Sequence, residues 1–326
     1  MTAFQPLVRN PHLQTIAAHY WRRRSRAARC ERRFYRTEPG VQVLVETDGP
    51  DGPPRGHVVL LHGLEGSSQA GYMLSLAAAA RAAGFIAHRF NFRTCGGTEH
   101  LCDTLYHAGL TSDLGYVLEQ LPEPAFLVGF SLGGNVALKL AGELGEEGFS
   151  RIRGVAAIST PLDLAACARR IGEPDNRIYE RRFVRKMRAR LLATGRYRAS
   201  QFAGLGTLYA LDDRITAPSF GFGTADRYYR TQSALGFLDR VRVPVLLIQA
   251  RDDTFVPFET FERAEVRNNP RIELLAPSHG GHLGFLGRRP HRFWAEDAAV
   301  EWMVGHALAC PDINHSAGES PAPPRT

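Results

Sequence analysis

Short apolar runs that alternate with helical patterns constrain this chain more than any other feature. Most of these runs are continuously apolar, which is typical of parallel strands in a sheet covered on both faces. The helical patterns between them supply the crossovers that a parallel sheet requires. The expected strands are residues 41–47, 57–61, 85–90, 125–129, 155–159, 243–249 and 272–275, and the expected helices are 72–83, 110–120, 132–143, 259–267 and 291–309.

One interval breaks this alternation. Residues 161–233 carry helical patterns but no clear strand, and a connection this long must have structure of its own. We interpret it as a helical lid inserted between the sixth and seventh strand positions. The predicted class is α/β, with a mostly parallel central sheet flanked by helices. Residues 1–310 are expected to form a single domain, and residues 311–326, rich in Pro and Ser, a disordered tail.

The charge of the chain is strongly positive, at +7, and 38 of its 40 basic residues are arginine. Basic proteins often bind nucleic acids or anionic membranes. No nucleic-acid-binding motif is present, and replacement of lysine by arginine is also what a GC-rich genome produces. We therefore expect no nucleic-acid partner. A weak contact with an anionic membrane surface, through the arginines near residue 22 and in the lid, stays an alternative.

Targeting and cysteine patterns point to an ordinary cytoplasmic enzyme. No apolar run reaches the roughly 18 residues of a membrane helix, and the first ten residues lack the apolar core of an export signal. The five cysteines form no CxxC pair, which argues against a disulfide framework and against a metal site. No cofactor is expected, and the oligomeric state is not predicted.

The sharpest motif is the segment Gly129-Phe130-Ser131-Leu132-Gly133, a G-x-S-x-G pattern between a predicted strand and a predicted helix. This context is typical of a nucleophile elbow, in which a strained turn lifts the serine hydroxyl clear of the sheet. Only small residues two positions before and after the serine let the strand and the helix pass each other. We predict Ser131 to be a nucleophile.

A serine nucleophile needs a base, and the base needs an acid to orient it. In this kind of fold the acid and then the histidine follow the serine in the chain. Asp252 and Asp253 follow the predicted strand 243–249, and we favour Asp253 as the acid. His279 and His282 follow the strand 272–275, and we favour His282 because two glycines precede it.

Backbone amides are expected to stabilise the oxyanion that forms during attack. One is the amide of Leu132, and the other is that of Leu64 in the loop His62-Gly63-Leu64-Glu65-Gly66-Ser67-Ser68. This loop lacks the G-K-[ST] ending of a phosphate-binding loop. Cys95, in a second glycine-rich turn, is interpreted as a structural thiol near the site.

Several segments together resemble the YheT-type α/β-hydrolases, a group of bacterial esterases and eukaryotic lipid-processing hydrolases. They are NPHLQT from Asn10, HGLEGSS from His62, NFRTCGG from Asn91, GFSLGGN from Gly129, ARDDTFVP from Ala250 and SHGGHLGF from Ser278. The resemblance covers about residues 10–309 and implies an α/β-hydrolase fold, with Ser131, Asp253 and His282 as nucleophile, acid and base. Thr94 departs from it, because glycine is expected there.

The expected activity is hydrolysis of short- to medium-chain carboxylic esters through an acyl-enzyme. The alternatives are acyl transfer to an alcohol, which the same residues can perform, and hydrolysis of lipids or phospholipids at an anionic membrane surface. A non-catalytic binding role on the same scaffold is a third class, since a fold does not fix a function.

Overall fold

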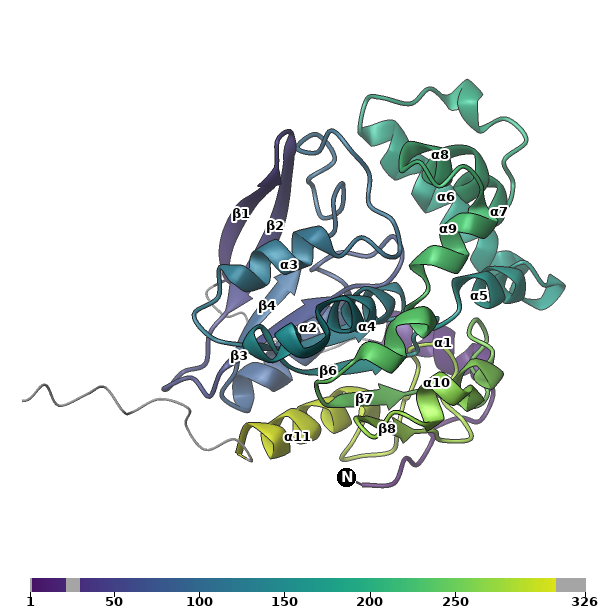
Figure 1. Cartoon of the computed structure of the whole chain (residues 1–326). Coiled ribbons are helices and arrows are strands. Elements are labelled where there is room, and N and C mark those ends of the chain that lie inside the picture. The colour runs from purple at the N-terminus through teal and green to yellow at the C-terminus, as the bar shows by residue number, and fades with distance from the viewer. Residues whose placement is uncertain (1, 22–29, 309–326) are drawn as a thin grey trace, which may run out of the picture.

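An eight-stranded sheet forms the centre of the molecule in this computed structural model, which describes residues 2–21 and 30–308 (Figure 1). The strands lie in the order β1-β2-β4-β3-β5-β6-β7-β8. β2 pairs antiparallel with both β1 and β4, whereas β3 to β8 run parallel to one another. The bounds are β1 (Cys30–Glu38), β2 (Val41–Asp48), β3 (His57–Leu61), β4 (Ile86–Phe90), β5 (Ala125–Phe130), β6 (Ile152–Ile158), β7 (Val245–Ile248) and β8 (Ile272–Leu275).

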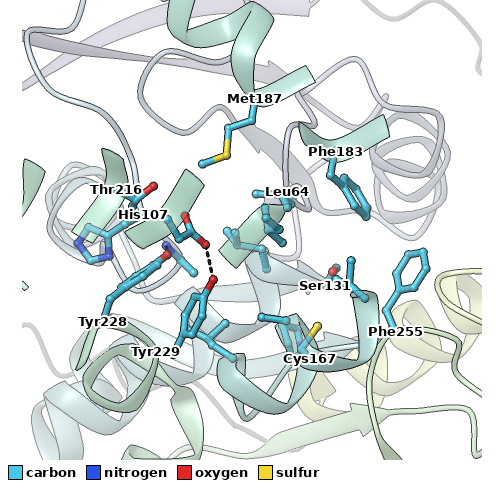
Figure 2. Close-up of a pocket in the computed structure, with 18 of the residues that line it drawn as sticks. Leu64, His107, Ser131, Cys167, Phe183, Met187, Thr216, Tyr228, Tyr229 and Phe255 are labelled. Carbon is cyan, nitrogen blue, oxygen red and sulfur yellow. Dashed lines mark hydrogen bonds between the residues drawn. The ribbon is translucent and has the colours of Figure 1, made fainter. Parts of the chain in front are cut away.

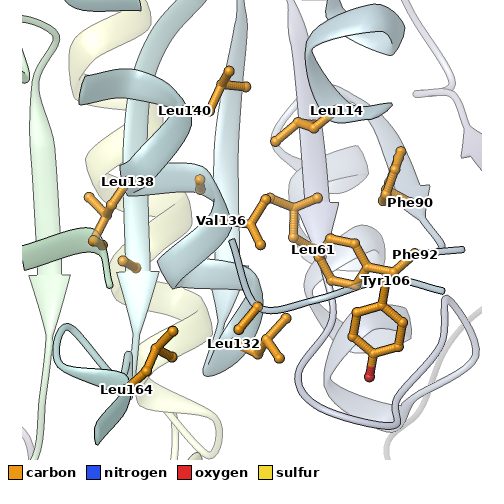
Figure 3. Packing of buried hydrophobic residues seen from close by; sticks show 14 of the residues in the cluster. Leu61, Phe90, Phe92, Tyr106, Leu114, Leu132, Val136, Leu138, Leu140 and Leu164 are labelled. Carbon is orange, nitrogen blue, oxygen red and sulfur yellow. The ribbon is translucent and has the colours of Figure 1, made fainter. Parts of the chain in front are cut away.

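Helices cover both faces of this sheet. Val58 and Leu60 of β3 belong to an apolar cluster with α2 and α11 on one face. Val59 and Leu61 belong to a second cluster with α3 and α4 on the other face, part of which is seen in Figure 3. Successive side chains of a strand point to opposite faces, so this strand is buried on both sides. The helices of the two layers are α2 (Gly71–Ala82), α11 (Trp294–Leu308), α3 (Ser112–Glu119) and α4 (Leu132–Leu144).

The predicted strands are all present, and those at 57–61 and 272–275 have the predicted bounds. The predicted α/β class and the mostly parallel sheet are therefore confirmed. The predicted helix 259–267 is wrong as a single element. It consists of a 3-10 turn, Phe258–Glu262, and the short α10 (Ala264–Arg267), because Arg263 between them has an extended backbone.

Two elements were not predicted from the sequence. β1 is an edge strand in which only Tyr35 is buried, so it has none of the apolar signal of the central strands. α1 (Pro11–Tyr20) begins where the Asn10 side chain accepts a hydrogen bond from the amide of Leu13. Asn followed by Pro is a recognisable helix start, and this signal was in the sequence.

The interval between β6 and β7 is helical in the structure. Residues 161–233, which we call the insertion, contain no strand, and α6 to α9 lie away from the body of the sheet (Figure 1). Its helices are α5 (Leu164–Ile171), α6 (Arg177–Ala193), α7 (Leu208–Leu211), α8 (Ala217–Ser219) and α9 (Ala225–Gln232). The predicted tail, residues 311–326, lies outside the described residues. Within residues 2–21 and 30–308, no helix has both the length and the apolarity to cross a bilayer.

Candidate active site

Ser131 lies in the sharp turn between β5 and α4. Its backbone has φ 51° and ψ −119°, in the positive-φ range that side chains with a Cβ rarely adopt. The neighbouring glycines make this turn possible. A Cβ on Gly129 would lie 2.4 Å from Gly134, and one on Gly133 would lie 2.4 Å from the carbonyl oxygen of Leu61. The strand and helix therefore pass as closely as the sequence motif predicts.

His282 connects Ser131 to a carboxylate. Its Nε2 lies 3.0 Å from Ser131 Oγ, and its Nδ1 lies 3.1 Å from both carboxylate oxygens of Asp253. Both His282 and Asp253 are buried. The ring of Phe255 lies against the imidazole, with the ring centres 4.5 Å apart. The three side chains are therefore brought together in the order expected from the sequence.

Asp253 is held by several donors besides His282. Its Oδ1 accepts hydrogen bonds from the amides of Phe255 and Val256 at 2.8 and 3.0 Å. Its Oδ2 accepts one from Gln249 Nε2 at 3.0 Å. These donors all come from the segment that follows β7, and they fix the orientation of the carboxylate toward His282.

Asp252 and His279, the other two candidates, bind each other. Asp252 Oδ2 lies 3.2 Å from His279 Nδ1, and its Oδ1 accepts a hydrogen bond from the amide of Gly281 at 2.9 Å. Neither residue lines the pockets around Ser131. Asp252 therefore braces the loop that carries His282, while Asp253 contacts the histidine itself.

The loop after β3 lies against the serine turn. A Cβ on Gly63 would be 3.3 Å from the Ser131 Cβ, so the two chains approach closely. Burial lowers the pKa of His62 to about 4, and this neutral ring donates from Nδ1 to the Gly63 carbonyl and accepts at Nε2 from the Phe92 amide. Across the described residues, the amides of Leu64 and Leu132 make no hydrogen bond. The oxyanion role of these two amides stays a prediction.

An ion pair between the insertion and this loop was not predicted. Arg190 of α6 binds both carboxylate oxygens of Glu65, with its Nη2 2.9 Å from Oε1, and donates to Thr94 Oγ1 at 2.7 Å. Thr94 has φ 59°, so it adopts the conformation for which glycine was expected. Arg190 is one arginine in a highly basic helix, and sequence offered no signal to single it out.

Helix α1 supports the loop that carries His282, and this role was also not predicted. The amide of His282 donates to Thr15 Oγ1 at 2.9 Å. The side chain of Gln14 binds both backbone groups of Leu286, at 2.8 and 3.1 Å. The segment NPHLQT, which carried much of the resemblance, therefore holds the loop between His282 and Leu286 in position.

Cys95 is buried, and burial raises the pKa of its thiol. A thiol of this kind stays protonated near neutral pH and is a poor nucleophile. It does not line the pockets around Ser131. These features fit the structural role inferred from the sequence.

Two pockets meet at Ser131 and His282. The first, of about 720 Å³ including its opening, is mainly apolar and is roofed by insertion residues such as Phe183 and Met187 (Figure 2). The second is wider and more polar, and it lies between α1, α6 and the loop after β3. A substrate bound at Ser131 therefore has two different environments for its two halves.

A family model described as the alpha/beta hydrolase family matches residues 58–296. The chain belongs to the alpha/beta hydrolase family. It is 30% identical, over 92% of each chain, to YheT of Escherichia coli (strain K12), an esterase by provisional assignment. The expected resemblance to YheT-type hydrolases is confirmed.

Another alpha/beta hydrolase relative is the phospholipase ABHD3 of Mus musculus. It is 28% identical over 72% of this chain and 60% of its own length. The solved structure of the Pyrococcus furiosus esterase Pf2001 superposes with a TM-score of 0.57 at 17% identity, covering 86% of this chain and 97% of that one. At this identity the likeness shows a shared fold. The protein is thus an alpha/beta hydrolase with esterase and phospholipase relatives.

Proposed function

We propose that this protein is a serine hydrolase that cleaves carboxylic esters through an acyl-enzyme. The observation that carries the proposal is the row of contacts from Ser131 Oγ to His282 Nε2 and from His282 Nδ1 to Asp253, at 3.0 and 3.1 Å. A serine hydroxyl near neutral pH needs such a base to become nucleophilic. The family and its esterase relatives support the same reaction class.

In the first step, Ser131 Oγ attacks the ester carbonyl carbon while its proton passes to His282 Nε2. The negative charge that develops on the carbonyl oxygen is received by the amides of Leu64 and Leu132, each worth about 3–4 kcal/mol in comparable sites. The resulting imidazolium is stabilised by Asp253. His282 then gives its proton to the departing alkoxide. The alcohol leaves, and the acyl group stays bound to Ser131.

In the second step, water replaces the alcohol. His282 removes a proton from the water, whose oxygen attacks the acyl carbonyl, and the serine leaves with the proton returned from His282. The apolar pocket receives the acyl chain, because it opens at Ser131 and its walls are mainly apolar, with Phe183 and Met187 of the insertion among them. We therefore propose short- to medium-chain acyl esters as substrates, with the insertion as a lid over the acyl chain.

The test combines covalent labelling with turnover. A fluorophosphonate probe should label Ser131 in the wild-type protein and fail to label Ser131→Ala. A series of p-nitrophenyl esters from acetate to palmitate should be hydrolysed by the wild type, with turnover lost in Ser131→Ala. Added ethanol measures how far an alcohol replaces water as acceptor. Retained esterase activity in pure Ser131→Ala protein contradicts the proposal.

A second candidate, hydrolysis of lipids at an anionic membrane surface, is supported by the surface beside the wider pocket. α1 and α6 contact each other through His12 and Tyr179. Tyr20 of α1 lines the wider pocket and is 71% exposed, and Ile178 of α6 is 79% exposed, which is unusual for side chains of this size. The same helix α6 also carries exposed cations, namely Arg177, Arg181, Arg185 and Lys186. The arginines at 22, 23, 24 and 26 lie outside the described residues.

Apolar side chains among cations are the chemistry that anionic lipid surfaces attract. The wild type should sediment with phosphatidylglycerol vesicles at low salt and be released as salt is added. The double variant Arg181→Glu/Arg185→Glu should lose this binding, while Arg36→Glu, an exposed arginine of β1, should keep it. Equal binding of the three proteins, or no binding at low salt, contradicts this second candidate.

A further inference from the structure

The apolar pocket has a polar wall on the side away from the nucleophile. Figure 2 shows Thr216, Tyr228 and Tyr229 across the pocket from Ser131 and Phe255. Tyr229 donates a hydrogen bond to Asp212 Oδ2 at 2.7 Å, and Asp212 also lines the pocket. An acyl chain that extends from Ser131 along the apolar walls therefore meets a carboxyl group.

Asp212 is buried without the arginine partner that several other buried acids have. Glu65 and Asp113 each bind an arginine at less than 3 Å. Among the described residues, the hydrogen bond from Tyr229 is the one of good geometry at the Asp212 carboxylate. The hydroxyl of Thr216 is close enough to lower the pKa of Asp212, but it makes no hydrogen bond of good geometry. The Asp212 carboxylate and the Thr216 hydroxyl can therefore still bind a polar group of a ligand at this wall.

No cation among the described residues pairs directly with Asp212, although the charge of Arg190 partly offsets the rise in its pKa that burial causes. Arg190 also lines the pocket, but its guanidinium is bound to Glu65 and Thr94. Burial lowers the pKa of His107 to about 3, so this ring is neutral. Burial also raises the pKa of Asp212 to about 6. A buried carboxyl without a cation costs folding free energy, and a wall of Leu, Met and Phe would avoid this cost.

The local backbone is also irregular at this point. Asp212–Thr216 forms a π-helical turn between α7 and α8. Such π-helical turns are rare in proteins, but many of those that occur lie at functional sites. The extra residue in the turn displaces side chains from their regular helical positions. Asp212 and Thr216, the first and last residues of this turn, both line the apolar pocket.

We propose that Asp212, Thr216 and Tyr229 form a subsite for a hydroxyl group carried on the acyl chain, distant from the ester carbonyl. This proposal rests on the esterase function proposed above. The hydroxyl of the substrate donates a hydrogen bond to the second oxygen of the Asp212 carboxyl group and accepts a hydrogen bond from the Thr216 hydroxyl. Both protein groups then have a hydrogen-bond partner. A neutral hydroxyl suits this mainly apolar pocket better than an ammonium group, because the pocket would strip water from a cation.

The test compares pairs of p-nitrophenyl esters of equal length, from hexanoyl to decanoyl. One member of each pair carries a terminal hydroxyl group, and shorter chains are omitted because their hydroxyl esters close to lactones spontaneously. At the length that reaches Asp212, kcat/KM should favour the hydroxylated ester by about 10- to 100-fold, the factor for a hydrogen bond to a charged group. Equal kcat/KM for both members at every length overturns the proposal.

Variants distinguish a binding role from a structural one. Asp212→Asn and Thr216→Val should lower the ratio of kcat/KM between hydroxylated and plain esters. Thr231→Val, a matched change at an exposed position of α9, should keep the wild-type ratio. If Asp212 only supports the fold, Asp212→Asn lowers both rates equally and leaves the ratio unchanged, which overturns the proposal. A preference for a terminal amino group over a hydroxyl also overturns it.

Failure of this proposal is distinct from failure of the esterase proposal. A wild-type protein that reacts with the fluorophosphonate probe and hydrolyses plain esters without a hydroxyl preference retains the esterase function and lacks the subsite. A wild-type protein that neither reacts nor hydrolyses any ester of the series lacks the function itself.

Discussion

Arg190 and Glu65 join the insertion to the loop that carries Leu64, through contacts of 2.9 to 3.0 Å between buried side chains. Tyr106 lies beneath the guanidinium, 4.7 Å from it. A buried ion pair of this kind contributes little net stability, yet removal of one partner is costly because the other charge stays buried.

Arg190→Met should therefore lower the free energy of unfolding by about 3–5 kcal/mol, because Glu65 is left without its cation. Esterase activity should fall as well, since Glu65 neighbours Leu64. Urea denaturation and ester turnover measure the two effects. Adding Glu65→Gln to this variant should restore part of the lost stability, and no restoration would show that the pair does not interact as described.

Asp253→Asn should reduce kcat by about 10⁴-fold, because the amide no longer holds the imidazole in the required tautomer or stabilises its cation. Asp252→Asn is the matched control on the adjacent residue, and it should change kcat by less than about tenfold, since Asp252 braces a loop by hydrogen bonds of ordinary strength. Steady-state kinetics on one soluble ester decide between them. The reverse order of effects would transfer the acid role to Asp252.

Thr15→Val should lower kcat while leaving KM nearly unchanged. The change removes the hydroxyl that receives the His282 amide, at 2.9 Å, and keeps the shape of the side chain. Loss of one such hydrogen bond costs about 1 kcal/mol, so a decrease in kcat of about fivefold is expected. Thr231→Val again serves as the control. A change in KM alone would mean that α1 shapes the binding pocket and not the position of His282.

Stability should fall as the pH drops from about 6.5 toward 4. Burial lowers the pKa of His62 and of His88 to about 4 in the folded protein. In the unfolded chain these groups bind protons at about pH 6.5, so acid favours unfolding between the two values. Urea denaturation at stepped pH should show a shallower decline for His88→Gln than for the exposed control His100→Gln. Identical slopes would rule out a buried neutral His88.

Asp212 should have the opposite effect on the pH dependence. Its pKa is raised to about 6, so the folded state binds more protons than the unfolded state between about pH 4 and 6. The charged form of the buried Asp212 destabilises the fold, and this destabilisation is present in full above pH 6 and decreases below that value. Asp212→Asn should therefore raise the free energy of unfolding at pH 8, by at most about 3 kcal/mol, and have less effect at pH 4.5. Destabilisation at pH 8 would contradict this.

The sequence predicts the central strands well because both their faces are buried, which leaves continuous apolar runs. It misses β1 because an edge strand with Tyr35 as its one buried side chain has no such run. Chain order narrows the acid to Asp252 or Asp253, but adjacent residues of one loop cannot be separated by pattern. The partners of Arg190 and Asp212 depend on how the helices of the insertion pack. Arg190 and Glu65 are 125 positions apart, and Asp212 and Tyr229 are 17 apart in different helical elements, so these contacts leave no local sequence signal.

The contacts of α1 with distant parts of the chain affect when, during folding, the protein becomes able to catalyse its reaction. Gln14 and Leu286 are separated by 272 positions, and Thr15 and His282 by 267. During synthesis, α1 therefore emerges well before these partners, and the residues between them have to be synthesised before the contacts can form. Contacts at such separation form late, because closing so long a loop costs entropy. A nascent chain with Ser131 already folded would still lack a supported His282 loop, and hydrolytic capacity would arrive only with the final stage of folding.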